Sequence, residues 1–185
     1  MSGTAILSRP VEVARIPSDG LEVDIVANDE ELTALAAAYD LVAVKGLRAT
    51  AALRRDDKGE VTVDGRTAAD VVQSCVVSLA PVDQHIEEPF SVRFVAPGSP
   101  DAPGPARPGA EVVVDPALPE PPEILTGATI DVGALAEEHF VLAIDPYPRA
   151  PGAVLSADQA QEIRGDADTP FAPLKGLVKT PPPKP

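Results

Sequence analysis

Apolar and polar residues alternate along much of the first 95 positions, a pattern that predicts β-strands joined by short turns. The first alternating stretch is broken by the turn sequence Pro17-Ser18-Asp19-Gly20. The next two lie on either side of the polar turn 56–59, which predicts a hairpin, and a third strand would extend it into an antiparallel meander. The predicted strand segments are 5–27, 41–55, 60–77 and 86–95.

Two segments carry helix signals instead. Asn28 and Glu31 have the spacing of a capping box, and the apolar residues that follow share one face at spacings of three and four, which predicts a helix over 28–40. Asp131 can cap a second helix that runs to Ala143. The residues that share one face of the first helix are Leu32, Leu35, Ala36 and Tyr39, and those roughly aligned in the second are Leu135, His139 and Leu142.

These elements predict an α+β fold, in which two helices pack on a twisted antiparallel sheet that is either open or partly closed into a barrel. We expect a single domain over residues 1–149. Nine of the 26 residues in 97–122 are prolines, which predicts an acidic, proline-rich insertion within that domain. Residues 150–185 are predicted to form a flexible tail, acidic first and then basic.

The formal net charge of the 185-residue chain is −14, and it is unevenly distributed. Residues 45–66 carry a net charge of +2 and residues 171–185 a net charge of +3, so the remainder is strongly acidic. An acidic body repels phosphate backbones and attracts basic partners, such as basic ribosomal proteins. The predicted basic patch lies on the hairpin and consists of Lys45, Arg48, Arg54, Arg55, Lys58 and Arg66. The alternatives for this patch are a solvated outer face and a contact with RNA phosphates or an acidic protein.

The residues that could carry reaction chemistry do not form a recognised catalytic or metal-binding motif. Cys75 and Ser78 have the spacing of a zinc pair but lack the second sulfur, and the apolar neighbours of Cys75 are expected to raise the pKa of its thiol. We therefore expect a buried structural thiol. The acidic pairs Glu87-Glu88 and Glu137-Glu138 are interpreted as solvated. No glycine-rich phosphate loop is present, and the sequence predicts no catalytic residue, metal, cofactor or small-molecule substrate.

Several motifs in a fixed order resemble the YceD family, the large ribosomal RNA subunit accumulation proteins, in an alphaproteobacterial form. The motifs occupy residues 72–81, 86–90, 130–138, 142–148 and 170–175, and the resemblance spans residues 5–178. Many members share a pattern that resembles Cys-x-x-Cys-Leu-x-Pro, and in this chain Ser78 takes the position of the second cysteine. The resemblance implies a non-enzymatic factor in the processing or accumulation of 23S rRNA and in ribosome assembly.

Two functional hypotheses arise from these features. The first is a binding factor for the rRNA, the precursor of the 50S particle or a basic ribosomal protein. The second is an adaptor without RNA contact that docks a partner through the proline-rich loop and a short tail peptide. The tail residues assigned to this peptide are Pro170, Phe171, Leu174 and Lys175. Residues 1–10 lack the pattern of a secretory signal and no apolar run approaches the ~20 residues of a membrane span, which predicts a cytoplasmic protein with no membrane partner.

Overall fold

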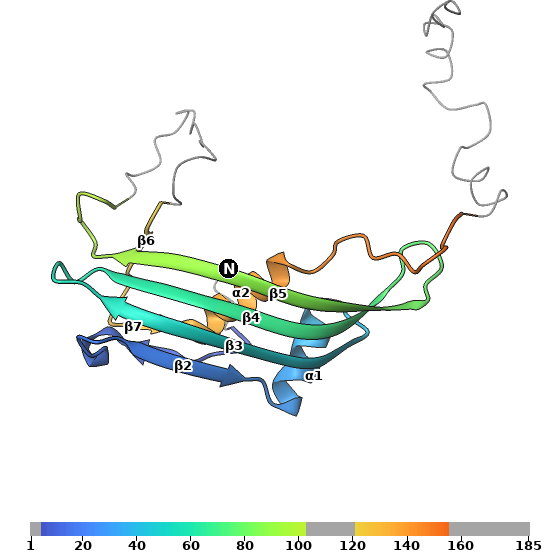
Figure 1. The fold of residues 1–185 in the computed structure, drawn as a ribbon, viewed down its shortest axis with the longest axis horizontal. Helices are drawn as coiled ribbons and strands as arrows, with labels where there is room; N and C mark the ends of the chain where they lie inside the picture. Colours follow the sequence, from blue (N-terminus) through green and yellow to red (C-terminus); the bar gives the residue numbers. More distant parts are fainter. Residues whose placement is uncertain (1–4, 103–120, 156–185) are drawn as a thin grey trace, which may run out of the picture.

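The structure is a computed structural model that describes residues 5–102 and 121–155 (Figure 1). The elements, in chain order, are β1 (Pro10–Glu12), the 3-10 turn η1 (Val13–Arg15), β2 (Leu21–Val26), α1 (Asp29–Ala38), β3 (Ala43–Arg55), β4 (Val61–Ser74), β5 (Pro81–Val95), β6 (Glu123–Ile124), β7 (Thr129–Asp131) and α2 (Val132–Leu142). The strand predicted over 86–95 begins earlier, at Pro81, because a proline can occupy the first position of a strand.

The main sheet has five strands in the order β2-β3-β4-β5-β6. Strands β2 to β5 form an antiparallel meander, and the short β6 pairs parallel to the end of β5. Strands β1 and β7 form a separate two-stranded sheet. The α+β prediction and the hairpin of β3 and β4 are confirmed. The alternative of a partly closed barrel is wrong, because no pairing joins β2 to β6 within the described ranges and the sheet remains open.

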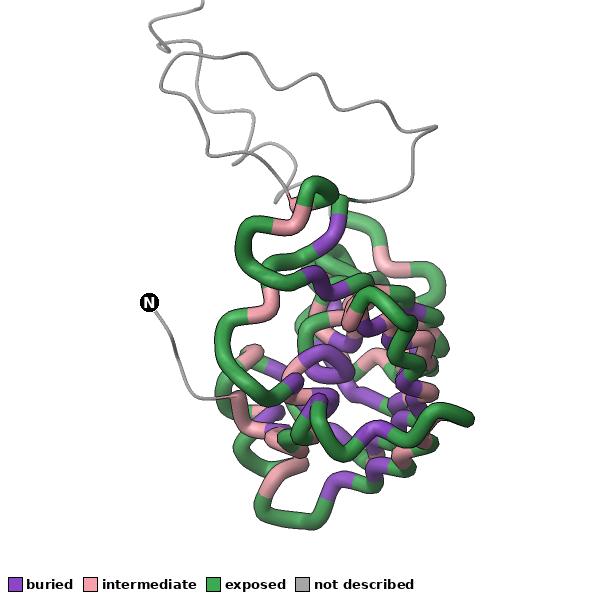
Figure 2. The backbone as a smooth tube through the Cα atoms, turned by 90° about the vertical axis from the view of Figure 1, so that its left-hand side faces the viewer, coloured by how far each residue is buried: buried purple, intermediate pink, exposed green. Residues whose placement is uncertain are grey.

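The hydrophobic core lies on one face of the sheet, between the long strands and the layer that contains both helices. Along β4, buried residues such as Val61, Val63, Ala69 and Val71 alternate with exposed or half-buried ones, as expected when one face of an antiparallel sheet is covered. Figure 2 shows buried residues gathered in the middle of the molecule with exposed residues around them. Most of this core is aliphatic, because only 3% of the chain is aromatic.

Helix α1 begins with the predicted capping box. The Asn28 side chain accepts a hydrogen bond from the Glu31 backbone N–H at 2.9 Å, and the Glu31 carboxylate accepts one from the Asn28 N–H at 2.9 Å. The same carboxylate forms a two-pronged ion pair with Arg9, with N–O distances of 2.8 and 3.1 Å. Leu35 is fully buried. The cap therefore also connects α1 to the N-terminal segment.

Helix α2 packs only in part through the residues that the sequence aligns. Leu135 is buried as expected, but Leu142 is 73% exposed and the fully buried aromatic residue is Phe140. Phe140 meets the Tyr39 ring edge to face, with ring centroids 6.4 Å apart. The prediction was wrong for Leu142 because apolar residues lie on both sides of this helix and spacing alone did not identify the side that faces the sheet.

Asp131 caps α2 and connects it to the N-terminal segment. Its carboxylate accepts hydrogen bonds from the Ala134 N–H at 3.1 Å, the Ser8 hydroxyl at 2.6 Å and the Arg9 N–H at 2.7 Å. Partial burial raises the pKa of Asp131, but these hydrogen bonds together have the larger effect and hold the pKa below its ordinary value. The predicted cap at this position is confirmed.

Replacing Asp131 with Asn should make the fold less sensitive to acid. Because the folded-state pKa is the lower one, the carboxylate stabilises the fold fully above the unfolded-state pKa, and this contribution is lost as the pH falls through the folded value. We expect Asp131→Asn to cost about 1 kcal/mol at pH 7, because the amide oxygen alone must replace two charged oxygens that accept three hydrogen bonds. The difference from wild type should shrink toward pH 3. Urea unfolding at both pH values measures this. The exposed Asp57→Asn variant is the control, and a pH-independent difference for Asp131→Asn would contradict the argument.

Candidate functional site

The predicted basic patch lies on the open face and at one end of the sheet. Exposed side chains of this patch come from β3, from β4 and from the turn between them: Lys45, Arg48, Arg54, Arg55, Lys58 and Arg66. Arg48 and Arg54 do share one face, as predicted, because they alternate along β3 with buried residues such as Leu47 and Leu53. The structure thus places the six basic residues on one hairpin.

Three of the six basic side chains are paired with carboxylates on the same face. The pairs are Lys45 with Asp83 at 2.5 Å, Arg54 with Asp64 at 3.4 Å and Arg66 with Glu87 at 2.5 Å. All of these groups are exposed, so each pair contributes little to stability. Their effect on the surface potential is larger, because they convert the predicted basic patch into a mosaic of both signs.

The second predicted site lies outside the described residues. It comprises the tail residues Pro170, Phe171, Leu174 and Lys175. Most of the proline-rich insertion, residues 103–120, also lies outside them.

Cys75 lies in the turn between β4 and β5, where the chain folds around its sulfur. The sulfur accepts hydrogen bonds from the backbone N–H of Ala150 at 3.3 Å and from those of Val77 and Ser78 at 3.4 Å each. The residue is buried, as expected. The expectation of a raised pKa is wrong. The hydrogen bond from the Ala150 N–H has the largest effect, the Ser78 side chain and the other hydrogen bonds add to it, and together they lower the pKa of the thiol to about 6.

The described residues around this turn do not include a cluster of side chains that could ligate a metal. No group of three or more His, Cys, Asp or Glu side chains that could hold a metal ion occurs there. Ser78, at the position of the second cysteine, contributes its backbone N–H to the Cys75 sulfur. The turn is hydrogen-bonded to the segment around Ala150, through the Ala150 N–H to the Cys75 sulfur and through the Val76 N–H to the Pro148 carbonyl oxygen.

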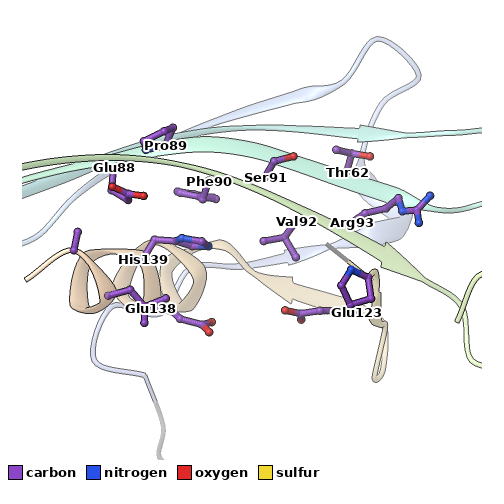
Figure 3. Close-up of a pocket in the computed structure, with 13 residues that line it drawn as sticks. Thr62, Glu88, Pro89, Phe90, Ser91, Val92, Arg93, Glu123, Glu138 and His139 are labelled. Carbon is purple, nitrogen blue, oxygen red and sulfur yellow. The ribbon is translucent and has the colours of Figure 1, made fainter. Parts of the chain in front are cut away.

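A groove lies between the inner face of β5 and helix α2. Its volume is about 900 Å³, and it is bounded at one end by β6. In Figure 3, Glu88, Phe90 and Val92 point from β5 toward the helix, whereas Pro89 and Ser91 lie on the other side of the strand. The residues that define the groove are Glu88, Phe90, Val92, Glu123, Glu138, His139 and Leu142.

The groove has an aromatic floor that depends on a glycine. The rings of Phe90 and His139 are stacked, with centroids 4.9 Å apart and an angle of 14° between their planes. On its other side the Phe90 ring covers Gly65, its cross-strand partner, where an added Cβ would overlap the ring and lie 2.8 Å from the Thr50 carbonyl oxygen. Gly65 therefore allows Phe90 to lie flat between the sheet and α2.

Three carboxylates surround this floor, from β5, β6 and α2 (Figure 3). Burial raises the pKa of Glu123, the nearby charge of Glu138 raises it further, and His139 opposes both effects. Arg93 also borders the groove, and Figure 3 shows its side chain directed away from the cavity. The groove is thus acidic with an apolar base, and a cation entering it would relieve the repulsion among the carboxylates.

Sequence reasoning missed this groove because it interpreted both acidic pairs as solvated. The interpretation holds for Glu87 and Glu138, which are exposed, but Glu88 is half-buried and faces the groove. It is wrong for Glu137, which is 6% exposed and accepts hydrogen bonds from the Leu7 N–H at 2.8 Å and the Tyr39 hydroxyl at 2.6 Å. On a helix, adjacent residues point about 100° apart, so the two members of this pair face different surroundings.

The fold and the groove define a small α+β protein with an open antiparallel sheet, two helices on one face and an acidic groove beside the last long strand. The chain belongs to the YceD family, described as the large ribosomal RNA subunit accumulation protein YceD, whose model matches residues 63–178. Neither the curated proteins nor the solved structures yield a match. The family is named for a role in the accumulation of large-subunit rRNA and is not a known enzyme family.

The matched region contains every residue that defines the groove but only one residue of the basic patch, Arg66. None of the helices in the described ranges is long and apolar enough to cross a membrane.

Proposed function

We propose that this chain promotes the accumulation of large-subunit rRNA by binding a basic protein of the large ribosomal subunit. The observation that carries the proposal is the acidic groove inside the matched family region. Two further features support it: the net charge of −14, and the ion pairs that balance half of the basic patch. Opposite charge accelerates association with a basic protein and opposes binding to phosphate backbones.

The proposed mechanism is non-enzymatic. A protein that binds rRNA carries clustered lysine and arginine side chains, and these attract other polyanions until the protein reaches its site. An acidic binding factor would cover such cations and release them to the rRNA, whose higher charge density competes for them. Delivery of the ribosomal protein would then stabilise the rRNA that it covers.

A capture experiment with purified components tests the proposal. The full chain is immobilised at 0.15 M salt and incubated with the protein fraction of purified large subunits, freed of RNA, and the retained proteins are identified by mass spectrometry. We expect one or a few basic proteins to be retained without RNA. A hairpin variant with Arg48→Glu, Arg55→Glu and Lys58→Glu should retain them equally well. Retention of no protein, or retention only when rRNA is added, would contradict the proposal.

Direct RNA contact through the hairpin is the second candidate. The observation that favours it is that, within the described ranges, the side-chain nitrogens of Arg48, Arg55 and Lys58 have no carboxylate oxygen within 4.0 Å. In-cell crosslinking, with sequencing of bound RNA and mass spectrometry of bound protein, separates the two candidates. If RNA crosslinks were abundant in the wild type and lost in the triple hairpin variant, the second candidate would replace the first.

A further inference from the structure

We infer that the groove between β5 and α2 binds an extended basic segment of the partner protein as an added strand along the free edge of β5, and that every second residue of this segment, which faces the groove, is in turn cationic and apolar. This inference rests on the proposed function and specifies the site and the chemistry of the segment recognised. It draws on three observations, namely the free strand edge, the order of side chains along it and the charge of the groove.

The first observation is that β5 has an edge available for a strand. On one side, β5 is paired with β4 from Pro81 to Phe94. On the other side, within residues 5–102 and 121–155, only Phe94 and Val95 are paired, with β6. The parallel pairing of β6 shows that this edge accepts a strand, and the backbone groups of residues 81–93 continue the same edge. Main-chain hydrogen bonds to such an edge give affinity in β-strand addition.

The second observation is the side-chain pattern that an added strand would meet. Alternate residues of β5 face the groove in the order carboxylate, aromatic ring and aliphatic side chain, from Glu88 to Phe90 to Val92. The opposite wall, on α2, also combines a carboxylate with an aliphatic side chain, because Glu138 and Leu142 lie one helical turn apart. Because successive residues of a strand point to opposite faces, only every second residue of the segment would face the groove. A segment in which these residues are in turn lysine or arginine and an aliphatic residue would place its charges by the carboxylates and its apolar side chains beside the Phe90 ring.

The third observation is the charge of the groove, which selects among occupants. The three carboxylates that line the groove repel RNA phosphates, so the occupant is a protein segment. A second copy of this chain is disfavoured, because it would bring carboxylates against carboxylates. A volume of about 900 Å³ accommodates a few side chains of an extended segment.

The test uses a fluorescein-labelled decapeptide with lysine and leucine in turn at its odd positions and threonine at its even positions, titrated with the full chain at 0.15 M salt and followed by fluorescence anisotropy. The groove variant carries Glu88→Gln, Glu123→Gln and Glu138→Gln. We expect the dissociation constant to rise about tenfold, because three partly exposed ion pairs are lost. The matched control, with Glu22→Gln, Asp24→Asn and Asp57→Asn, changes the net charge equally at a distance from the groove and should stay within about twofold of wild type.

Two further measurements locate the peptide. Leu142→Ser, at a side chain that is 73% exposed and so dispensable for folding, should weaken binding by about threefold. Amide chemical-shift changes in nuclear magnetic resonance spectra should concentrate in β5 and α2. Equal weakening in the groove and control variants would overturn the inference, since it indicates diffuse attraction by the acidic body. Loss of binding in a chain lacking residues 103–120, with the groove residues intact, would also overturn it.

The groove variant also separates this inference from the proposed function when it is used in the capture experiment. If wild type and groove variant retain the same basic proteins equally, the groove is not the site but the proposed function stands. If the wild type retains no basic protein, the proposed function fails regardless of peptide binding. Selective loss in the groove variant supports both.

Discussion

Replacing Glu137 with alanine should destabilise the fold by about 3 kcal/mol, measured as a lower urea midpoint with an unchanged slope. The carboxylate is buried and accepts hydrogen bonds from the Leu7 N–H at 2.8 Å and from the Tyr39 hydroxyl at 2.6 Å. Its removal therefore leaves two donors without a partner. Burial, together with the neighbouring Glu137 charge, raises the pKa of Tyr39 to about 12, as expected for a hydroxyl that donates to a carboxylate.

The controls for this prediction come from the same contacts. Glu138→Ala removes the adjacent, exposed carboxylate and should change stability by no more than about 0.5 kcal/mol. Tyr39→Phe removes one of the two hydrogen bonds and should cost about 1 kcal/mol. A loss for Glu137→Ala no larger than that for Glu138→Ala would show that Glu137 does not connect α1, α2 and the N-terminal segment.

Gly133→Ala should also destabilise the fold, by about 3 kcal/mol, although alanine is the better helix former by about 1 kcal/mol. Gly133 lies in the first turn of α2, where an added Cβ would overlap the Leu7 carbonyl oxygen and lie 2.8 Å from the Arg9 backbone nitrogen. The N-terminal segment cannot move aside without losing its hydrogen bonds to Glu137 and Asp131.

The matched control is Gly46→Ala in β3. An added Cβ at Gly46 meets no heavy atom within 4 Å, and its backbone is not left-handed, so the substitution should be neutral or slightly stabilising. Urea midpoints of both variants, measured under the same conditions, provide the comparison. Equal effects at the two glycines would rule out the close approach of Leu7 to α2 as the cause.

Both predictions concern the junction between the N-terminal segment, α1 and α2, which also positions the helix that lines the groove. Leu7, Arg9 and Tyr39 precede the matched region 63–178, and they position the start and middle of α2. The C-terminal half of the same helix presents Glu138, His139 and Leu142 to the groove. Variants that loosen the junction should therefore weaken peptide binding in proportion to their loss of stability, whereas the groove variant should weaken binding alone.

The elements themselves were largely predictable from local sequence. Alternation of side chains indicated β3 and β4, because a covered sheet imposes a period of two on any strand that crosses it. Asn28 with Glu31, and Asp131, indicated where both helices begin, because capping depends on residues three positions apart. The packing face of α2 was not predictable, since it depends on Tyr39 and the sheet, which are distant in the chain.

The candidate site was predicted less well because its properties arise between elements. The sequence placed the basic residues on one hairpin, as the structure does, but the pairing of three of them depends on the assembled sheet. Asp64 and Glu87 lie diagonally across from Arg54 and Arg66 on the neighbouring strands, and Asp83 on β5 reaches Lys45 across β4. The lowered pKa of Cys75 depends on Ala150, 75 residues away in the chain. The groove requires β5, β6 and α2 to be assembled before Glu88, Glu123 and Glu138 come together.

By itself, the sequence determined the fold class, the helix caps, the acidic net charge and the resemblance to the YceD family. Each of these depends on composition or on short-range spacing, which the chain carries whether or not it is folded. Tertiary structure alone decided that Glu137 is buried while Glu138 is exposed, that the hairpin is a charge mosaic and that an acidic groove lies beside a free strand edge. Burial and charge pairing are set by neighbours in space, and only folding brings those neighbours together.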